Sequence, residues 1–387
     1  MGKKVLILGA GFGGLEAASI LRERLDESHS ITLVDKNDHF IIGFSKFEVM
    51  FGRKSAGQVK SYYKDLAYEG VNFVRDTIEV IDPERKRVET RNHTFDYDFL
   101  IVGLGAELAP EAMPGFVEGG YEFYSLEGAE RLYPVLEGFT AGTILLSVFG
   151  KPIKCPPAPF EAVFQLHDFF SARGVREAID LKMLIPAPAP MPNARGAAEQ
   201  LKRRLAERNI SLLTEHKVTG LVPVSRQALV KGREPLAYDL FIGVPLHRAP
   251  KVVRESPLGK GGWIKVDHQN LATEFENVYA VGDVTQIPVG DKAVPKAGAF
   301  AEAAARVVAA DIIYKITGQD RPMPFEATGV CFLEFGGGQV AQVSANYLGG
   351  PEPESVLEGP SEALRLGKER FERERLERWF RRPTGQG

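Results

Sequence analysis

The chain of 387 residues carries 48 basic and 51 acidic side chains, which leaves a formal net charge of −3. This balance lacks the basic excess of nucleic-acid-binding proteins, so we expect no nucleic-acid partner. The hydrophobic content of 44% is enough for two or three domains with large cores.

Only two cysteines are present, Cys155 and Cys331, which excludes a framework of several disulfides. No apolar run reaches the roughly 18 residues of a membrane span. The first apolar strand begins at Lys3, which leaves no room for a signal peptide. We therefore expect a cytoplasmic protein.

The first 25 residues contain "KKVLILGAGFGGLEAASILRERL", an apolar run followed by glycines and an amphipathic helix. The glycines fit the pattern GxGxxG. Gly9 permits the tight turn, Gly11 lets a pyrophosphate approach the backbone, and Gly14 lets the helix pack closely on the strand. The phosphates of a dinucleotide would lie at the N-terminus of the helix, where free N–H groups and the dipole favour anions.

The segment "SITLVDK" (30–36) contains a second predicted strand, which ends in Asp35, 21 residues after Gly14. A carboxylate at this spacing binds a ribose hydroxyl in dinucleotide-binding folds. We place its neighbour Lys36 in the same cofactor site. The acidic residue favours FAD or NAD over NADP.

Two later segments favour FAD. The segment "FENVYAVGDVT" (275–285) is a predicted strand that ends in Gly282 and Asp283. In FAD enzymes with two dinucleotide-binding folds, such an aspartate hydrogen-bonds the ribitol chain. The segment "YDFLIVGLGAEL" (97–108), with Gly105, resembles the strand and turn that lead out of the FAD domain of those enzymes.

The segment "VPKAGAFAEAAARVVAADII" (294–313) predicts a helix that begins under the flavin, with Gly298 in its first turn. The positive end of its dipole, together with Lys296, would stabilise negative charge on reduced flavin. We therefore interpret the cofactor as FAD.

The chain resembles the flavoproteins with two dinucleotide-binding domains over nearly its whole length. It is most similar to the group of sulfide:quinone oxidoreductases and flavocytochrome c sulfide dehydrogenase flavoproteins. The motifs that carry this resemblance are "LGAGFGG", "AVGD", "VPKAGAF", "KCPPAPFE" and "TGVCFLEFGGG".

The resemblance implies an α/β fold with two Rossmann-like domains. The FAD domain would be discontinuous (1–112 and 241–325), with a second dinucleotide-type domain inserted at 113–240. A small C-terminal domain (326–387) would cover the flavin and carry Cys331.

The cytochrome-linked members tether FAD through a cysteine in the loop after the second strand. Here that loop reads "HFIIGFSKFEVMFG" and contains no cysteine, so we expect non-covalent FAD. The third cysteine of typical quinone-linked members is also absent.

The inserted domain has a strand, "TILLSVFG" (143–150), followed by "KPIKCPPAPFE" (151–161) where a phosphate-binding turn would stand. Its prolines lack N–H groups, so the first turn of the next helix cannot offer a row of amides to a pyrophosphate. After the next strand, "PAPAPMP" replaces the carboxylate or arginine that NAD or NADP requires. Both features predict that the nicotinamide site has been lost.

Cys155 stands at this turn, at the expected N-terminus of a helix, with Lys151 and Lys154 nearby. A thiol in such a place is expected to have a lowered pKa. The resemblance implies that Cys331, in "GVCFLEFG", meets Cys155 to form a redox pair. The alternative is that both are inert, buried thiols.

Glu161 follows Cys155 by six positions, and the family pattern also has an acid here. It is therefore a candidate for moving protons for the incoming sulfide. The alternative is a first-turn carboxylate that the helix dipole favours. The histidines and cysteines show no ligand spacing, so no metal site is predicted.

The resemblance implies FAD-dependent oxidation of sulfide, or of small sulfur species, to polysulfide or sulfur. Hydrosulfide would attack a Cys155–Cys331 bridge, and the electrons would pass through FAD to a quinone or a cytochrome c. The sequence does not say which cysteine faces the flavin. Two alternatives remain: an NADH:quinone oxidoreductase of the same fold, and a flavin-bearing redox-sensing protein with little turnover.

The C-terminal segment 361–383 is strongly charged, and its apolar residues make only a ragged helical stripe. Arginine with tryptophan and phenylalanine suits a peripheral contact with a membrane. A solvated helix, or a helix packed in a dimer, is the alternative. We also expect a homo-oligomer.

Overall fold

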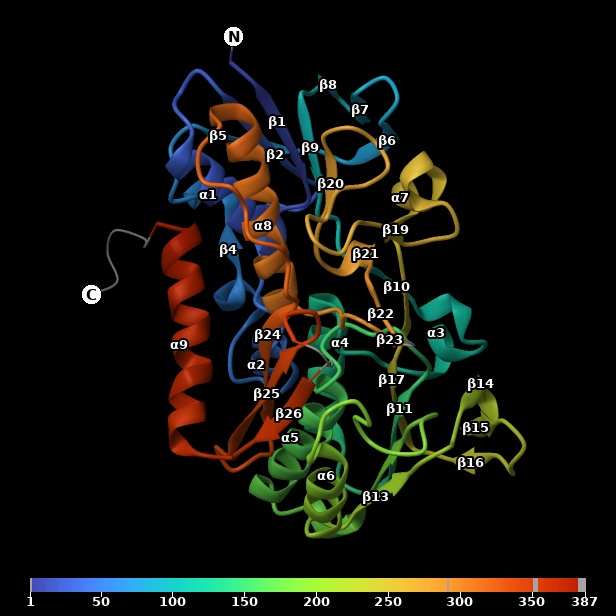
Figure 1. Ribbon diagram of the computed structural model, residues 1–387. Coiled ribbons are helices and arrows are strands. Elements are labelled where there is room, and N and C mark those ends of the chain that lie inside the picture. Colours follow the sequence, from blue (N-terminus) through green and yellow to red (C-terminus); the bar gives the residue numbers. More distant parts are fainter. Residues whose placement is uncertain (1, 291, 351–353, 382–387) are drawn as a thin grey trace.

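The computed structural model describes residues 2–290, 292–350 and 354–381. Two parallel sheets, each with its own helices, lie one above the other, and a smaller C-terminal part covers their junction (Figure 1). The predicted α/β fold with two dinucleotide-type domains is confirmed.

The first sheet has five parallel strands in the order β20-β9-β1-β2-β5. Four of them come from the first 102 residues and the fifth from residues 278–280, so the rest of the fold is inserted between them. The bounds are β1 (Lys4–Leu8), β2 (Ser30–Asp35), β5 (Val71–Arg75), β9 (Phe99–Val102) and β20 (Val278–Ala280). Both faces of this sheet are covered, which explains why its central strands are almost continuously apolar.

One face of this sheet is covered by α1 (Phe12–Arg24) and α8 (Gly298–Thr317), which pack side by side (Figure 1). The other face packs against a hairpin sheet and the short helix α7 (Lys251–Glu255). The hairpin strands are β6 (Ile78–Asp82), β7 (Arg87–Thr90) and β8 (Thr94–Asp96). The packing of α1 against α8 and the sheet fixes the position of this helix directly after the glycine turn.

The second sheet has four parallel strands in the order β13-β12-β11-β17. The strands are β11 (Gly142–Val148), β12 (Ile179–Leu184), β13 (Ile210–Leu213) and β17 (Leu240–Val244), with helices α4 (Leu126–Gly138), α5 (Ala158–Ala172) and α6 (Ala197–Ala206). Because β17 pairs with β11, this sheet extends past residue 240, where the sequence placed the end of the inserted domain.

The C-terminal part is an antiparallel sheet of β24 (Thr328–Glu334), β25 (Val340–Asn346) and β26 (Glu354–Glu358), followed by the long helix α9 (Glu362–Trp379). Figure 1 shows α9 lying along one side of the molecule, next to the layer of α1 and α8. Residues 382 and 383 of the charged segment lie outside the described residues, as do 351–353 and 384–387.

Short elements connect these layers. They are β3 (His39–Phe40), α2 (Ser45–Met50), β4 (Ser61–Tyr62), β10 (Glu107–Ala109), α3 (Phe116–Gly119), β14 (Val218–Val222), β15 (Gln227–Val230), β16 (Leu236–Ala237), β18 (Leu246–Arg248), β19 (Ile264–Lys265), β21 (Thr285–Gln286), β22 (Pro288–Val289) and β23 (Lys292–Ala293).

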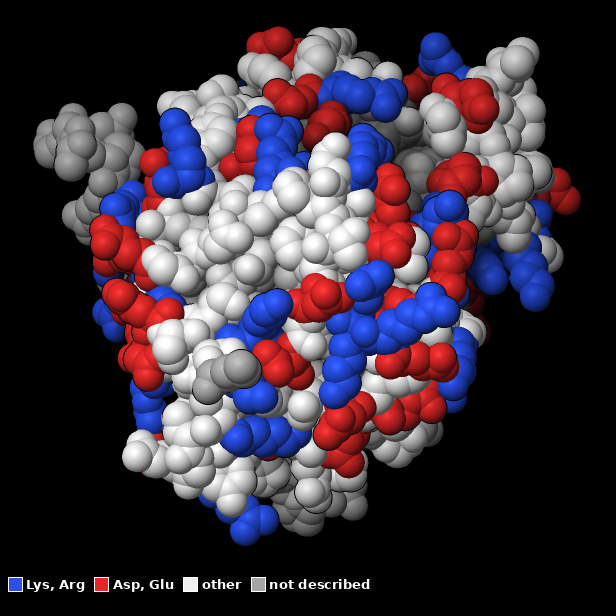
Figure 2. Space-filling view, turned by 90° about the horizontal axis from the view of Figure 1, so that it is seen from above, with Lys and Arg blue, Asp and Glu red and all other residues white. Residues whose placement is uncertain are grey.

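Charges of both signs are mixed on the face of the molecule that Figure 2 shows, without a large region of one sign. This mixture agrees with the small net charge of the whole chain. Within the described part of the chain, no helix is long and apolar enough to cross a membrane.

Candidate flavin and thiol site

A cavity of about 300 Å³ lies where the two parallel sheets and the C-terminal part meet. Ligands of open α/β sheets bind at this kind of place, outside the carboxyl ends of the strands. The predicted site residues that line the cavity are Gly11, Gly105, Cys155, Glu161, Gly282, Asp283, Gly298 and Cys331. Four other predicted residues, Gly9, Gly14, Asp35 and Lys36, do not line it, and neither does Lys296.

The glycine turn after β1 has the shape that a phosphate-binding turn requires. A Cβ atom on Gly9 would lie 2.4 Å from the carbonyl oxygen of Gly103, and one on Gly14 would lie 1.9 Å from the carbonyl oxygen of Gly9. In contrast, a Cβ on Gly11 or on Gly105 would meet no heavy atom within 4 Å. The chain is therefore closely packed behind the turn and open in front of it, where the N-terminus of α1 faces the cavity.

Asp35 supports this turn from the end of β2. Its Oδ2 accepts a hydrogen bond from the Ala10 N–H (2.8 Å), and its Oδ1 accepts one from the Asn37 N–H (2.8 Å). Oδ1 also accepts from the Asn37 side-chain amide (3.0 Å), so Oδ2 is the oxygen with a further lone pair for a ribose hydroxyl. The neighbouring Lys36 side chain is exposed to solvent.

Asp283 lines the cavity, and its carboxylate has no hydrogen-bond partner among the described residues. Burial raises the pKa of this carboxyl. A partly buried carboxylate without a partner is costly, and a polyhydroxyl chain such as ribitol would supply the missing donors. The open glycine turn, the helix N-terminus and this carboxylate together fit FAD.

Lys296 holds the loop at Asp283 rather than facing the cavity. Its Nζ donates to the carbonyl oxygens of Asp283 (2.6 Å) and Thr285 (2.9 Å) and lies 3.5 Å from the ring centroid of Trp263. Burial lowers the pKa of this ammonium to about 8. Its own carbonyl oxygen accepts a hydrogen bond from the Cys155 N–H (2.8 Å), so Lys296 links the two loops.

Cys155 lies in the loop before α5, in the left-handed region with φ of 47°. Its carbonyl oxygen accepts a hydrogen bond from the Ala158 N–H (2.9 Å), which fixes the loop to the start of α5. Cys331 lies on β24, and both thiols line the same cavity as free, partly buried cysteines. The fold has thus brought two residues separated by 176 positions (331 − 155) to one cavity.

The lowered pKa that we expected for Cys155 is not found. Burial raises the pKa of Cys155, and the nearby Cys331 and Glu161 raise it further. Burial also raises the pKa of Cys331 to about 12. The expectation rested on the helix N-terminus alone, whereas enclosure of the thiol penalises the charged form more strongly.

Glu161 lies in the first turn of α5 and is almost completely buried. Its Oε1 accepts a hydrogen bond from Lys368 Nζ (2.9 Å), and the same Nζ donates to Glu334 Oε2 (2.9 Å). Burial raises the pKa of Glu161, although Lys368 acts in the opposite direction. The ion pair joins α5 to α9 at the wall of the cavity.

Sequence reasoning missed Lys368, which lies on α9 within the charged segment. Its neighbour along the helix, Phe371, lines the cavity, and the Arg375 guanidinium lies 3.6 Å from the Phe371 ring centroid. The spacing of these three residues, i, i+3 and i+7, is a helical face. The helical spacing that directs this face of α9 toward the cavity was therefore visible in the sequence, but the face is largely charged and not apolar.

A family model described as pyridine nucleotide-disulphide oxidoreductase matches residues 3–138. The mitochondrial sulfide:quinone oxidoreductase of Dictyostelium discoideum is 26% identical over 312 residues, which are 75% of this chain and 67% of that protein. The X-ray structure of the sulfide:quinone oxidoreductase from Aquifex aeolicus matches with a TM-score of 0.87 at 20% identity, covering 97% of this chain and 91% of that one. A type II NADH:quinone oxidoreductase from Staphylococcus aureus is 24% identical over 321 residues, which are 75% of this chain and 76% of that protein.

The chain is a flavoprotein oxidoreductase, and it is similar to sulfide:quinone oxidoreductases over most of its length. The predicted FAD cofactor and the predicted resemblance are both confirmed. In this flavoprotein the described residues contain no group of three or more His, Cys, Asp or Glu side chains placed to hold a metal ion.

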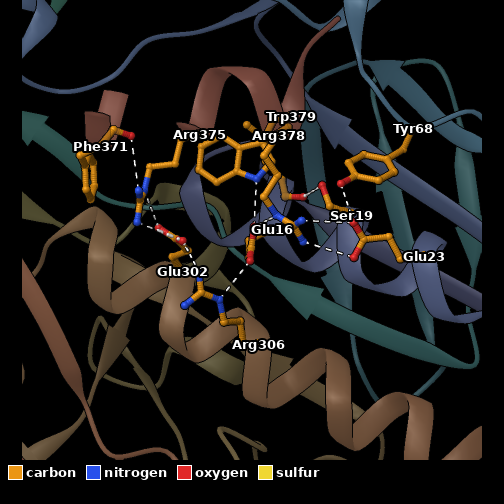
Figure 3. Close-up of polar contacts among 11 residues, drawn as sticks. Glu16, Ser19, Glu23, Tyr68, Glu302, Arg306, Phe371, Arg375, Arg378 and Trp379 are labelled. Carbon is orange, nitrogen blue, oxygen red and sulfur yellow. Dashed lines mark hydrogen bonds and ion pairs between the residues drawn. The ribbon is translucent and has the colours of Figure 1, made fainter. Parts of the chain in front are cut away.

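The C-terminal helix of the flavoprotein is fixed to the FAD-binding part by two buried carboxylates (Figure 3). Glu16 on α1 accepts hydrogen bonds from Arg378 Nε (2.8 Å) and Trp379 Nε1 (3.0 Å) of α9. Glu302 on α8 accepts one from Arg375 Nε (2.9 Å). Because the basic residues of α9 point inward to these carboxylates, the apolar stripe of this helix is ragged.

Acid precipitation of the flavoprotein is expected to release its yellow cofactor into the supernatant. The reason is that the segment 37–53, which follows β2, contains no cysteine that could form a thioether with the flavin. The measurement is the visible absorbance of supernatant and pellet. Colour retained in the pellet of both the parent and a Cys155→Ser variant would show a covalent link at another residue.

Proposed function

We propose that the flavoprotein oxidises sulfide, or another small sulfur species, through Cys155 and Cys331. The observation that carries the proposal is that both thiols line the cavity that also contains Gly11 and Asp283. Cysteine is the most nucleophilic of the ordinary catalytic side chains, and covalent catalysis divides one difficult step into two.

In this proposal the pair begins oxidised, as a disulfide. Hydrosulfide attacks one sulfur, the S–S bond breaks, one cysteine becomes a persulfide, and the other leaves as a thiolate. Such an exchange depends on access and on the pKa of the leaving thiol. FAD, when bound, supplies a two-electron acceptor for the oxidation.

Glu161 is proposed to hold and release the proton of the incoming sulfide. Its raised pKa brings the carboxyl closer to neutral pH, which suits a general acid or base. Lys368 orients the carboxyl through a direct ion pair, and Glu334 binds the other side of the ammonium. This arrangement gives Glu161 a defined position beside the thiols.

A quinone is the acceptor that the comparisons favour, because quinone stands in the names of the relatives. The cavity wall formed by Phe44, Phe332 and Phe371 is aromatic, which suits a planar, apolar ring. A cytochrome c acceptor remains the alternative. A quinone dissolved in a bilayer would require a peripheral membrane contact, for which α9 is the candidate.

Anaerobic titration with sulfide is expected to bleach the visible absorbance of the flavin, whereas NADH is expected to do so poorly. Pro156 and Pro157 directly precede α5 and Pro159 lies in its first turn, in place of an amide-rich turn, so NADH phosphates lack donors there. Saturable reduction by NADH but not by sulfide would identify an NADH:quinone oxidoreductase. Slow reduction by both donors would favour the redox-sensing alternative.

A further inference from the structure

Two lysines without partners line the cavity beside Cys155. Lys46 belongs to α2, and Lys154 precedes Cys155 in the chain. Among the described residues, neither ammonium group makes a hydrogen bond or an ion pair with another side chain. In contrast, Lys368, which pairs with the cavity residue Glu161, is held between two carboxylates. Lys46 and Lys154 are therefore cations without a direct ion pair at this end of the cavity, and the Asp283 carboxylate acts on Lys154 only from a distance.

The two ammonium groups are close enough to act on each other and on the thiol. Burial, together with the positive charge of Lys154, lowers the pKa of Lys46 to about 8, whereas Cys155 acts in the opposite direction. Two like charges in a half-buried place are unfavourable without an anion between them. The carboxylates that act on Lys46 from neighbouring elements are Glu122 and Glu127. Glu122 accepts hydrogen bonds from the Tyr124 and Ser125 N–H groups.

Two buried polar groups next to these lysines also lack partners. Tyr124 lines the cavity, is 7% exposed, and its hydroxyl has no hydrogen-bond partner within the described part of the chain. His247 lies behind it, with its ring centroid 5.2 Å from that of Tyr124 and its Nε2 also without a partner. Burial, with Lys154 next in importance, lowers the pKa of His247 to about 3, so the ring is neutral at ordinary pH. Unsatisfied buried groups are rare, and they indicate a missing ligand or water.

We propose that Lys46 and Lys154, together with Tyr124, form a subsite that holds a small sulfur anion beside Cys155. This inference rests on the proposed function and specifies its substrate class: the hydrosulfide anion on entry and a polysulfide dianion as the chain grows. Two ammonium groups match a dianion better than a neutral molecule. A neutral quinone or the uncharged form of hydrogen sulfide would gain nothing from them.

The test measures the charge selectivity of Cys155 in the FAD-bound protein, and it needs no turnover. In a Cys331→Ser background Cys155 is the only cysteine, so alkylation reports on this thiol alone. The rates with iodoacetate, which is an anion, and with neutral iodoacetamide are measured and divided by the same ratio for a free thiol. Any change in the pKa of Cys155 affects both reagents equally and cancels in the ratio.

We expect the normalised ratio to exceed one in the parent. It should fall by about fivefold to tenfold in Lys46→Met and in Lys154→Met, as expected when one nearby unit charge is removed from a partly screened cavity. Lys46→Arg and Lys154→Arg should keep the parent ratio. Lys54→Met is the matched control, because Lys54 is exposed just after α2 and does not line the cavity. If a methionine variant loses its flavin, glutamine replaces methionine at that position.

An unchanged ratio in both lysine variants, or an equal fall in Lys54→Met, overturns the subsite. A second measurement separates this result from the proposed function. With both cysteines present, Lys46→Met should raise the sulfide concentration that half-saturates flavin reduction. If the alkylation ratio falls but the parent flavin is not reduced by sulfide, the anion subsite stands and its assignment to sulfide is wrong.

Discussion

Replacing Cys155 by serine, or Cys331 by serine, is expected to slow sulfide-driven flavin reduction by about 10³-fold or more, with FAD still bound. Both thiols line the cavity, but neither belongs to the glycine turn or to the Asp283 loop that fit the cofactor. A hydroxyl cannot form the S–S bond that sulfide attacks in the proposed mechanism, so the loss should be almost complete in each single variant. The measurement is anaerobic stopped-flow absorbance after mixing with sulfide.

Chemical reduction by dithionite provides the control for these variants, since it needs no thiol and should bleach the flavin of parent and variants alike. Because the proposed mechanism uses the two cysteines as a unit, the double variant should be no slower than either single variant. A Cys155→Ser protein that is reduced by sulfide at nearly the parent rate would exclude the thiol mechanism. It would also return the two cysteines to the alternative of inert, buried thiols.

The glycine turn and the Asp35 carboxylate that supports it were predictable because they follow local rules. Gly9 and Gly14 are required by contacts with the immediately neighbouring backbone, and Asp35 lies at a fixed spacing from them. The approach of Cys331 to Cys155 was not predictable from local rules. It depends on how a C-terminal sheet packs on the inserted domain, and only the resemblance to a known family suggested it.

The electrostatics of the site were least accessible to sequence reasoning. The helix N-terminus before Glu161 predicted a lowered thiol pKa, but burial of Cys155 reverses the direction. Likewise Lys296 was expected to face the flavin, and its donors are instead directed to two backbone carbonyls. The sign of such effects depends on enclosure and on partners distant in the sequence, such as Lys368 for Glu161.

Replacing Glu16 by alanine is expected to lower the free energy of unfolding by about 3 kcal/mol. Glu16 is 2% exposed. Its carboxylate accepts hydrogen bonds from Arg378 and Trp379 of α9 and from the Arg306 Nε of α8 (3.0 Å). Without the carboxylate, the fully buried indole N–H of Trp379 has no acceptor, and Arg378 and Arg306 each lose one of their two carboxylate partners (Figure 3). Since α9 carries Phe371 and Lys368 to the cavity, flavin should also be released at a lower urea concentration.

Glu23→Ala is the matched control for this anchor. Glu23 lies on the same helix and binds the same Arg378 (Nη1, 3.1 Å), but its side chain is 39% exposed. Exposed pairs of this kind contribute at most about 1 kcal/mol, so this variant should stay close to the parent. Urea unfolding followed by circular dichroism, with flavin release recorded in parallel, measures both variants. Equal losses in the two variants would show that burial of Glu16 adds nothing to the anchor.

The contacts of Glu16 with Arg378 and Trp379 also predict that the stability of the protein depends on pH. Burial alone would raise the pKa of Glu16, but the hydrogen bonds from Arg378 and Trp379 outweigh it and hold the pKa below its ordinary value of 4.5. A carboxyl whose pKa is lower in the folded state stabilises the protein above its unfolded pKa, and this contribution disappears as the pH falls through the folded value. The stability difference between the parent and Glu16→Gln should therefore be constant near neutral pH and shrink below pH 4.5. A difference that persists unchanged in acid would mean that Glu16 acts through its shape and not through its charge.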